Sequence, residues 1–139
     1  MSEIVSSEFK EFLKHIKLID IRCVELDARN ENSSGLLPER VDFKFDDTLN
    51  YNMDNERFIC KIGSSLKVLS GEVEIAHVRT AFNLINEIEP AYLAPKEMIE
   101  MYLTQNAVFI VYPYVREIMQ STIGRMGLGN FVLNYMLRN

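Results

Sequence analysis

The chain has 139 residues, of which 47% are hydrophobic and 25% are charged, and its formal net charge is −5. These values are typical of one folded domain, and the negative charge argues against nucleic acid or an anionic membrane as the main partner. The longest apolar run is far shorter than the ~18 residues of a membrane span, and residues 1–20 lack the uncharged core of a signal peptide. A cytoplasmic protein is therefore expected.

The chain is predicted to begin with a short helix or arm over residues 1–15. Phe9 and Phe12 fall at helical spacing there, after serines that can cap a helix. From Ile16 the apolar period changes to two, which is typical of a strand. The apolar positions change phase near Cys23, so a β-bulge is predicted at that residue.

An antiparallel sheet is predicted over residues 16–86. Val41, Phe43 and Phe45 alternate with charged residues and give the clearest strand pattern, whereas residues 47–55 are polar and are predicted to be a connection. Two long alternating strands follow, joined by a tight hairpin at Ser70-Gly71. Because turns and loops join the four strands, one face of the sheet is expected to meet solvent.

A long helix is predicted over residues 95–124, with a break near Pro113, and residues 130–139 are predicted to form a short terminal helix or strand. Residues 108–112 are apolar on every side of this helix, so they need cover on more than one face. That need indicates a partner chain. The expected interface consists of Val108, Phe109, Val111, Tyr112, Val115 and Met119.

The sequence predicts no catalytic, metal or cofactor site. Its two histidines, His15 and His77, have no motif around them and are expected at the surface or at a boundary. Phosphate-loop, zinc-site and nucleophile-elbow motifs are absent from the sequence. Cys23 and Cys60 both lie in strand patterns and are expected to be buried thiols. The protein is therefore not expected to be an enzyme.

Phenylalanine, tyrosine and methionine are plentiful, at 8, 6 and 7 residues. Most of these side chains are expected in the core. Any that remain at the surface would suit the binding of varied or unfolded peptides, because thioethers and rings adapt to many shapes.

Two segments resemble those of one family. Residues 112–117 read Tyr-Pro-Tyr-Val-Arg-Glu and are similar to the Phe-Pro-Tyr-Ala-Arg-Glu signature of SecB, the tetrameric bacterial export chaperone. Residues 38–46 resemble the second strand of that family, which also follows a proline and alternates apolar with charged residues. The resemblance covers roughly residues 12–137. It implies an α+β fold, in which a four-stranded antiparallel sheet is followed by a long kinked helix.

The family resemblance also implies a function and partners. It implies an ATP-independent holdase, without cofactor or metal, that keeps unfolded polypeptides ready for protein export. It further implies a homo-oligomer, a tetramer built as a dimer of dimers, with neither nucleic-acid binding nor membrane insertion. The client-binding residues that it implies, along an apolar groove, are Val41, Phe43, Phe45, Phe131 and Tyr135.

The sequence departs from the family where SecB contacts its motor partner, SecA. Asp20 falls at one acidic contact position, but His77 stands where another carboxylate is expected, so the contact with SecA is in doubt. Two alternatives therefore stay open. One is a SecB-like chaperone dedicated to an antitoxin or another single partner. The other is a small-ligand-binding or enzymatic α+β domain with a pocket under the helix.

Overall fold

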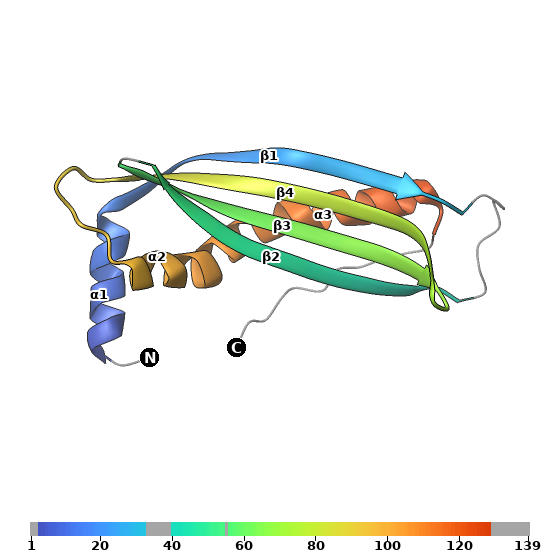
Figure 1. The fold of residues 1–139 in the computed structure, drawn as a ribbon, viewed down its shortest axis with the longest axis horizontal. Helices are drawn as coiled ribbons and strands as arrows, with labels where there is room; N and C mark the ends of the chain where they lie inside the picture. The colour runs from blue at the N-terminus through green and yellow to red at the C-terminus, as the bar shows by residue number, and fades with distance from the viewer. Residues whose placement is uncertain (1–2, 33–39, 55, 129–139) are drawn as a thin grey trace.

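The computed structural model describes residues 3–32, 40–54 and 56–128. Strands β1 (Ile16–Asn30), β2 (Asp42–Asp54), β3 (Arg57–Ser70) and β4 (Val73–Ile88) form one antiparallel sheet in the order β1-β4-β3-β2. Helix α1 (Glu3–Lys14) precedes the sheet; α2 (Lys96–Tyr102), the π-helical turn η1 (Leu103–Ala107) and α3 (Val108–Met126) follow it. In Figure 1 these last three run end to end, from α2 below the left end of the sheet to α3 behind the strands. The predicted α+β architecture is confirmed.

The core lies between the helices and one face of the sheet. Alternate residues of β3 and β4 are buried there, including Phe58, Leu66 and Leu84, none of which is exposed to solvent. The predicted hairpin is also confirmed: Gly71 has a φ of 64°, a left-handed conformation that glycine adopts without a steric penalty.

Two bulges interrupt the pairing of β1 with β4. The register shifts between Cys23 and Glu25, which confirms the predicted bulge, and also between Leu18 and Asp20, which the sequence did not predict. The residues in the bulges, Ile19 and Val24, are 37% and 55% exposed. Each extra residue changes which face the following side chains take.

Strand β2 is longer than predicted. Residues 47–55 were expected to be a connection, but β2 continues to Asp54 and stays paired with β3 throughout. Leu49 and Tyr51 keep the phase of Phe43 and Phe45 on the helix-facing side, which they share with the partly buried Asp47; the even-numbered polar residues between them point the other way. The polar composition arises because β2 is an edge strand with one solvent-facing side.

The irregular turn of the long helix lies before Pro113. The helix was expected to break near that proline, but Pro113 lies inside α3, and the π-helical turn covers Leu103–Ala107. The Thr104 hydroxyl group there lies 3.2 and 3.3 Å from the carbonyl oxygens of Glu100 and Met101, which loosens the regular helical pairing of these groups. Gly127, with a φ of 71°, caps α3, as the glycine-rich end of this segment predicted.

Among the described helices, none is both long enough and apolar enough to cross a membrane. The predicted terminal segment, residues 130–139, lies outside the described residues.

Candidate functional site

A row of apolar side chains follows the helix-facing side of β2. Each member of this β2 apolar row is partly buried and packs against the core without being fully covered. Across β3 the row is paired with buried residues such as Val68, Leu66 and Ile62, so it extends the core toward the edge of the sheet. The row consists of Val41, just before the strand, and of Phe43, Phe45, Leu49 and Tyr51.

The position of β2 at the edge of the sheet makes this row suited to peptide binding. In the order β1-β4-β3-β2, β2 is an edge strand, and among the described strands it pairs with β3 alone. An edge strand presents backbone N–H and C=O groups to which an extended peptide can pair, while alternate side chains select the peptide's apolar residues. The β2 apolar row therefore joins two means of holding an extended chain.

The structure brings together three of the five predicted client-binding residues. Val41, Phe43 and Phe45 share one side of β2, whereas Phe131 and Tyr135 lie outside the described residues. Sequence reasoning missed Leu49 and Tyr51, because residues 47–55 looked like a connection. The signal that identifies them is the return of apolar residues in the phase of Phe43 and Phe45, after an interruption at Asp47.

The predicted interface residues of α3 are mostly covered by the chain itself. Val108, Val111, Tyr112, Val115 and Met119 are at most 5% exposed. These five lie on the stripe of α3 that packs against the sheet, so their cover comes from their own protomer and not from a partner. Phe109 is half-buried and remains available to a second chain.

Three other apolar residues of α3 are only partly covered by the rest of the described chain. Tyr114 is 49% exposed, although its ring centroid lies 6.0 Å from that of Phe82 in β4, and Ile110 and Phe109 are partly exposed. We call these three residues the exposed side of α3. The helix is thus apolar on two sides, as the sequence indicated, but the residues that remain for a partner differ from most of those predicted.

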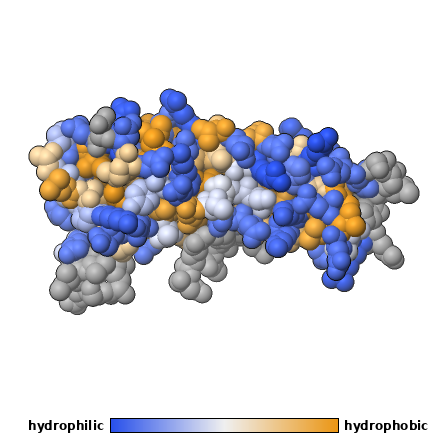
Figure 2. All heavy atoms as spheres, viewed as in Figure 1, coloured by the Kyte–Doolittle hydropathy of each residue, from blue (hydrophilic) through white to orange (hydrophobic). Residues whose placement is uncertain are grey.

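The other face of the sheet carries a mosaic of charges. Figure 2 shows a largely hydrophilic face, with hydrophobic residues gathered along its upper edge near β1. Asp20, the predicted motor contact, lies on this face and forms an ion pair with Arg22. Acidic and basic side chains alternate along the face, so no acidic patch surrounds Asp20. The charged residues on this face are Lys17, Asp20, Arg22, Glu25, Asp27, Arg29, Asp42, Lys44, Asp46, Asp54, Arg57, Lys61, Lys67, Glu74, Arg79 and Glu87.

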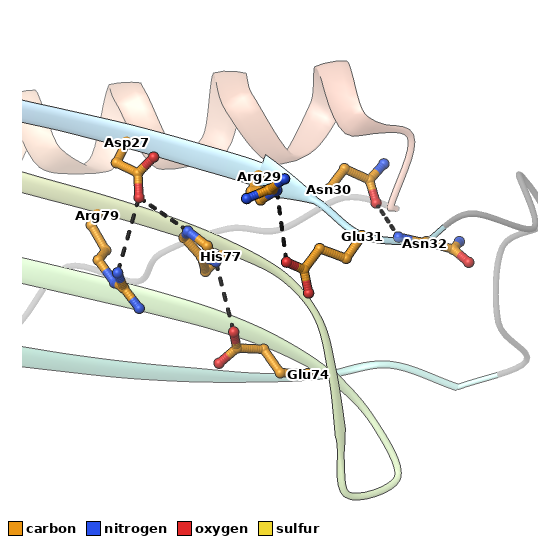
Figure 3. Close-up of polar contacts among 8 residues, drawn as sticks. All are labelled: Asp27, Arg29, Asn30, Glu31, Asn32, Glu74, His77 and Arg79. Atoms are coloured by element: carbon orange, nitrogen blue, oxygen red, sulfur yellow. Dashed lines mark hydrogen bonds and ion pairs between the residues drawn. The ribbon is translucent and has the colours of Figure 1, made fainter.

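His77 lies in the same mosaic but is more buried than predicted. Its Nε2 atom is 3.1 Å from Oδ2 of Asp27 and its Nδ1 atom is 3.7 Å from Glu74 (Figure 3). The residue is only 9% exposed, because its cross-strand neighbours Arg29 and Lys67 flank the ring on both sides. Asp27 is shared with Arg79, so this group forms a network of ion pairs across β1 and β4.

Three open cavities formed by the described residues lie away from the β2 apolar row. The largest, about 370 Å³, is at the start of β1 and is lined by charged residues including Lys17, Glu56 and Arg57. The others lie beside the connection between β4 and α2 and in the centre of the charged face, around Gly63. None of the three lies between the helix and the sheet, where the small-ligand alternative placed its pocket.

The cysteines and acidic groups offer little chemistry. Burial raises the pKa of the Cys60 thiol to about 12, so this thiol stays protonated and unreactive. Cys23 is exposed, contrary to expectation, because it adjoins a bulge on the edge strand β1. The described residues contain no group of three or more His, Cys, Asp or Glu side chains that could bind a metal ion.

The sequence matches no family model and no curated protein. Among solved structures, the Mycobacterium tuberculosis Rv1957 SecB-like chaperone, in complex with a ChAD peptide from the Rv1956 HigA1 antitoxin, has a TM-score of 0.80 at 18% identity, over 95% of this chain and 99% of that chain. A protein of unknown function from Streptococcus agalactiae, at 10% identity and covering 86% of this chain and 97% of that chain, reaches a TM-score of only 0.43, too low to support an argument. The chain therefore has the fold of the SecB-like chaperones, as the segment at residues 112–117 indicated.

Proposed function

We propose that this protein is an ATP-independent holdase chaperone that binds unfolded or extended polypeptides in the cytoplasm. The observation that carries the proposal is the β2 apolar row, which presents partly exposed aromatic side chains along an edge strand. Apolar burial and backbone pairing suffice to hold an extended chain, so the activity needs neither nucleotide nor metal.

A small-ligand or enzymatic function has weaker support. The three cavities are open and lined largely by charged, small polar or loop residues, and they lie outside the helix–sheet interface. A site for a small molecule is usually concave, mostly apolar and equipped with a few convergent polar groups. The β2 apolar row is long and open, which suits a polypeptide better than a compact ligand.

The charged face favours a dedicated client over delivery to SecA. Resemblance to SecB implies acidic contacts with that motor on the sheet, but here Asp20 is paired with Arg22 and basic residues balance the acidic ones. The structurally similar Rv1957 protein is bound to an antitoxin peptide. A second candidate is therefore a chaperone for an antitoxin or another single partner, with the same β2 apolar row as its binding surface.

We also propose that the protein assembles into a homotetramer, as a dimer of dimers. The exposed side of α3 offers Phe109, Ile110 and Tyr114 as apolar surface that a second protomer can bury. With a chain mass of 16.1 kDa, the native mass is expected to be about 64 kDa, the closed symmetric assembly expected of such a protein.

Aggregation of a reduced, unfolded model protein tests the holdase function. The purified chain should suppress aggregation at stoichiometric amounts without nucleotide, and the double variant Phe43→Ser/Phe45→Ser should lose most of this suppression. Lys44→Ser/Asp46→Ser is the matched control, because it changes the same strand on its opposite face. Equal loss in both variants, or none in either, would reject the β2 apolar row as the binding surface.

Competition between clients separates the two candidates. An unfolded preprotein and an extended peptide from the antitoxin encoded beside this chain, where there is one, are titrated against the same preparation. A dedicated chaperone should bind the antitoxin peptide at least tenfold more tightly and show no binding to SecA. Comparable affinities together with SecA binding would favour the export function.

A further inference from the structure

His15 connects three elements of the fold through its ring. Its Nδ1 atom is 2.7 Å from Oε2 of Glu89, in the connection after β4, and its Nε2 atom is 3.0 Å from Oε1 of Glu11 in α1. The ring stacks on Tyr92 with a centroid distance of 4.2 Å and an angle of 14° between the ring planes. The main-chain N–H of Glu89 also donates to the His15 carbonyl oxygen, at 2.9 Å. Helix α1, the start of β1 and the β4–α2 connection therefore meet at one side chain.

This geometry fits the protonated ring better than the neutral one. A neutral imidazole has one N–H and one lone pair, so one carboxylate would face a lone pair at hydrogen-bond distance. An imidazolium donates to both Glu11 and Glu89, and the stacked Tyr92 ring favours a cation further. The hydrogen bond with Glu89, followed by that with Glu11, raises the pKa of His15 above its ordinary value, against a smaller opposing effect of burial.

Other charged groups near the ring do not reverse this preference. The cavity that His15 lines also carries Lys17, Arg57, Glu56 and Glu87, so two carboxylates balance its two cations. Lys14 lies on the same helix and approaches Glu11 at 3.7 Å, so it shares that carboxylate with His15. Glu8 adds negative charge near Tyr92. The hydrogen bond with His15, and then the charge of Lys14, lower the pKa of Glu11.

The contacts of His15 bear on whether α1 stays docked. Phe12 of α1 is fully buried, and its ring centroid lies 6.0 Å from that of Phe58, 6.3 Å from that of Tyr102 and 6.5 Å from that of Tyr92. A helix of 12 residues is marginal on its own in water, so α1 depends on such contacts for its stability. Undocking of α1 would uncover this aromatic cluster.

We propose that His15 is a protonation-controlled latch. Its imidazolium form holds α1 against the β4–α2 connection, and loss of the His15 proton loosens α1 from the aromatic cluster. Because the pKa of His15 is raised in the docked state, its contribution is complete below about 6.5 and is lost as the pH rises through the raised value. The pKa of Glu11 is lowered, so its contribution is present above the ordinary carboxyl value and is lost as the pH falls through the lowered one. The latch is therefore closed between these two limits and opens on the alkaline side by loss of the His15 proton.

Hydrogen exchange measures the latch directly. Protection factors of the α1 amides, corrected for the intrinsic pH dependence of exchange, should fall as the pH rises past neutrality. The fall should approach about tenfold for each unit by which the pKa of docked His15 exceeds that of the open state. Amides of β3 and β4 serve as the internal reference and should show no such step.

Variants and a direct titration complete the test. His15→Gln should abolish the step, as should the double variant Glu11→Gln/Glu89→Gln, which keeps the ring and its stacking. His77→Gln, which changes the other histidine of the chain, should leave the step in place. A step that survives in His15→Gln, flat α1 protection in the wild type, or an NMR titration of the wild-type His15 ring at or below its ordinary pKa would overturn the proposal. The titration needs no variant, so it decides the matter even where a variant fails to fold.

Discussion

The hydroxyl group of Tyr102 donates a hydrogen bond to Oδ1 of Asn86 at 3.0 Å, in the interface between α2 and β4. Asn86 is fully buried and Tyr102 is 4% exposed. The Asn86 amide nitrogen in turn lies 3.4 Å from the Leu84 carbonyl oxygen. A buried polar pair of this kind fixes where the helix crosses the sheet, because any other position would leave the amide without partners.

Tyr102→Phe should destabilise the protein by about 1–3 kcal/mol. The substitution keeps the ring and its packing on Phe58 but removes the hydroxyl that donates to Asn86 Oδ1. The free energy of unfolding from urea titration measures the effect. Adding Asn86→Leu to Tyr102→Phe should recover part of the loss, because the double variant no longer buries an unsatisfied amide. A second loss of stability as large as that of Tyr102→Phe alone would contradict this account.

The same tyrosine predicts a loss of stability at high pH. Burial raises the pKa of Tyr102 to about 12, so the folded state retains a proton that the unfolded state gives up near pH 10. Stability should therefore decline as the pH rises from about 10 to about 12. In Tyr102→Phe this part of the decline should be missing, which urea titrations at several alkaline pH values would show. An unchanged decline would assign it to other groups.

Phe109→Asp should split the assembly and leave the protomer folded. Phe109 is partly exposed, so the carboxylate of an aspartate at this position would be solvated in a free protomer but unpaired in a dry interface. Native mass should fall from about 64 kDa toward that of smaller species, with an unchanged circular dichroism spectrum.

Val111→Asp is the contrasting variant. Val111 is fully buried against the sheet, so a carboxylate there should unfold the protomer itself. If Phe109→Asp kept the full assembly mass, the exposed side of α3 would not be the interface. If Val111→Asp stayed folded and only dissociated, the originally predicted stripe would be the interface after all.

Gly63 and Gly124 should respond in opposite directions to alanine. A Cβ at Gly63 would lie 2.7 Å from Thr48 Oγ1 on the neighbouring strand, whereas one at Gly124 would meet nothing within 4 Å. Gly63→Ala should cost about 1 kcal/mol, since Thr48 must leave its rotamer, and Gly124→Ala should stabilise α3 by about 0.5–1 kcal/mol. Thermal unfolding measures both. Thr48→Ala should rescue Gly63→Ala; failure of the rescue would place the strain elsewhere.

Alternation of side chains made most of the sheet predictable. The phase change at Cys23 located a bulge, and the alternation of Val41, Phe43 and Phe45 placed three residues of the β2 apolar row on one side. Both features are local, because successive side chains of a strand point to opposite faces of the sheet. The bulge between Leu18 and Asp20 carried no comparable signal, because its extra residue, Ile19, is apolar and fits either phase of the pattern.

Features that depend on tertiary packing were not predictable. Sequence pattern identified a helix apolar on more than one side, but it could not say that the sheet covers Val111 and Met119 while Phe109 and Tyr114 stay partly exposed. The π-helical turn before Pro113 depends on side-chain contacts with the backbone, which composition does not specify. The His15 contacts join residues 74 positions apart, so no local pattern could indicate them.

Ala91→Gly should stabilise the protein, although it removes a side chain. Ala91 has a φ of 69°, the one non-glycine residue with a positive φ among those described. It occupies the third position of the turn from Glu89 to Tyr92, where Pro90 is second and the Tyr92 N–H donates to the Glu89 carbonyl oxygen at 3.1 Å. Such a turn favours glycine at that position.

The net gain should be about 0.5–1 kcal/mol, because relief of the left-handed strain exceeds the extra entropy of glycine in the unfolded chain. Ala94→Gly, in the same connection but without a positive φ, is the control and should lose stability. Urea titration of both variants measures the difference, and a loss in Ala91→Gly as large as in Ala94→Gly would contradict the strain. The turn also positions Glu89 and Tyr92 against His15, so Ala91→Gly should keep the pH step in α1 protection while raising overall stability.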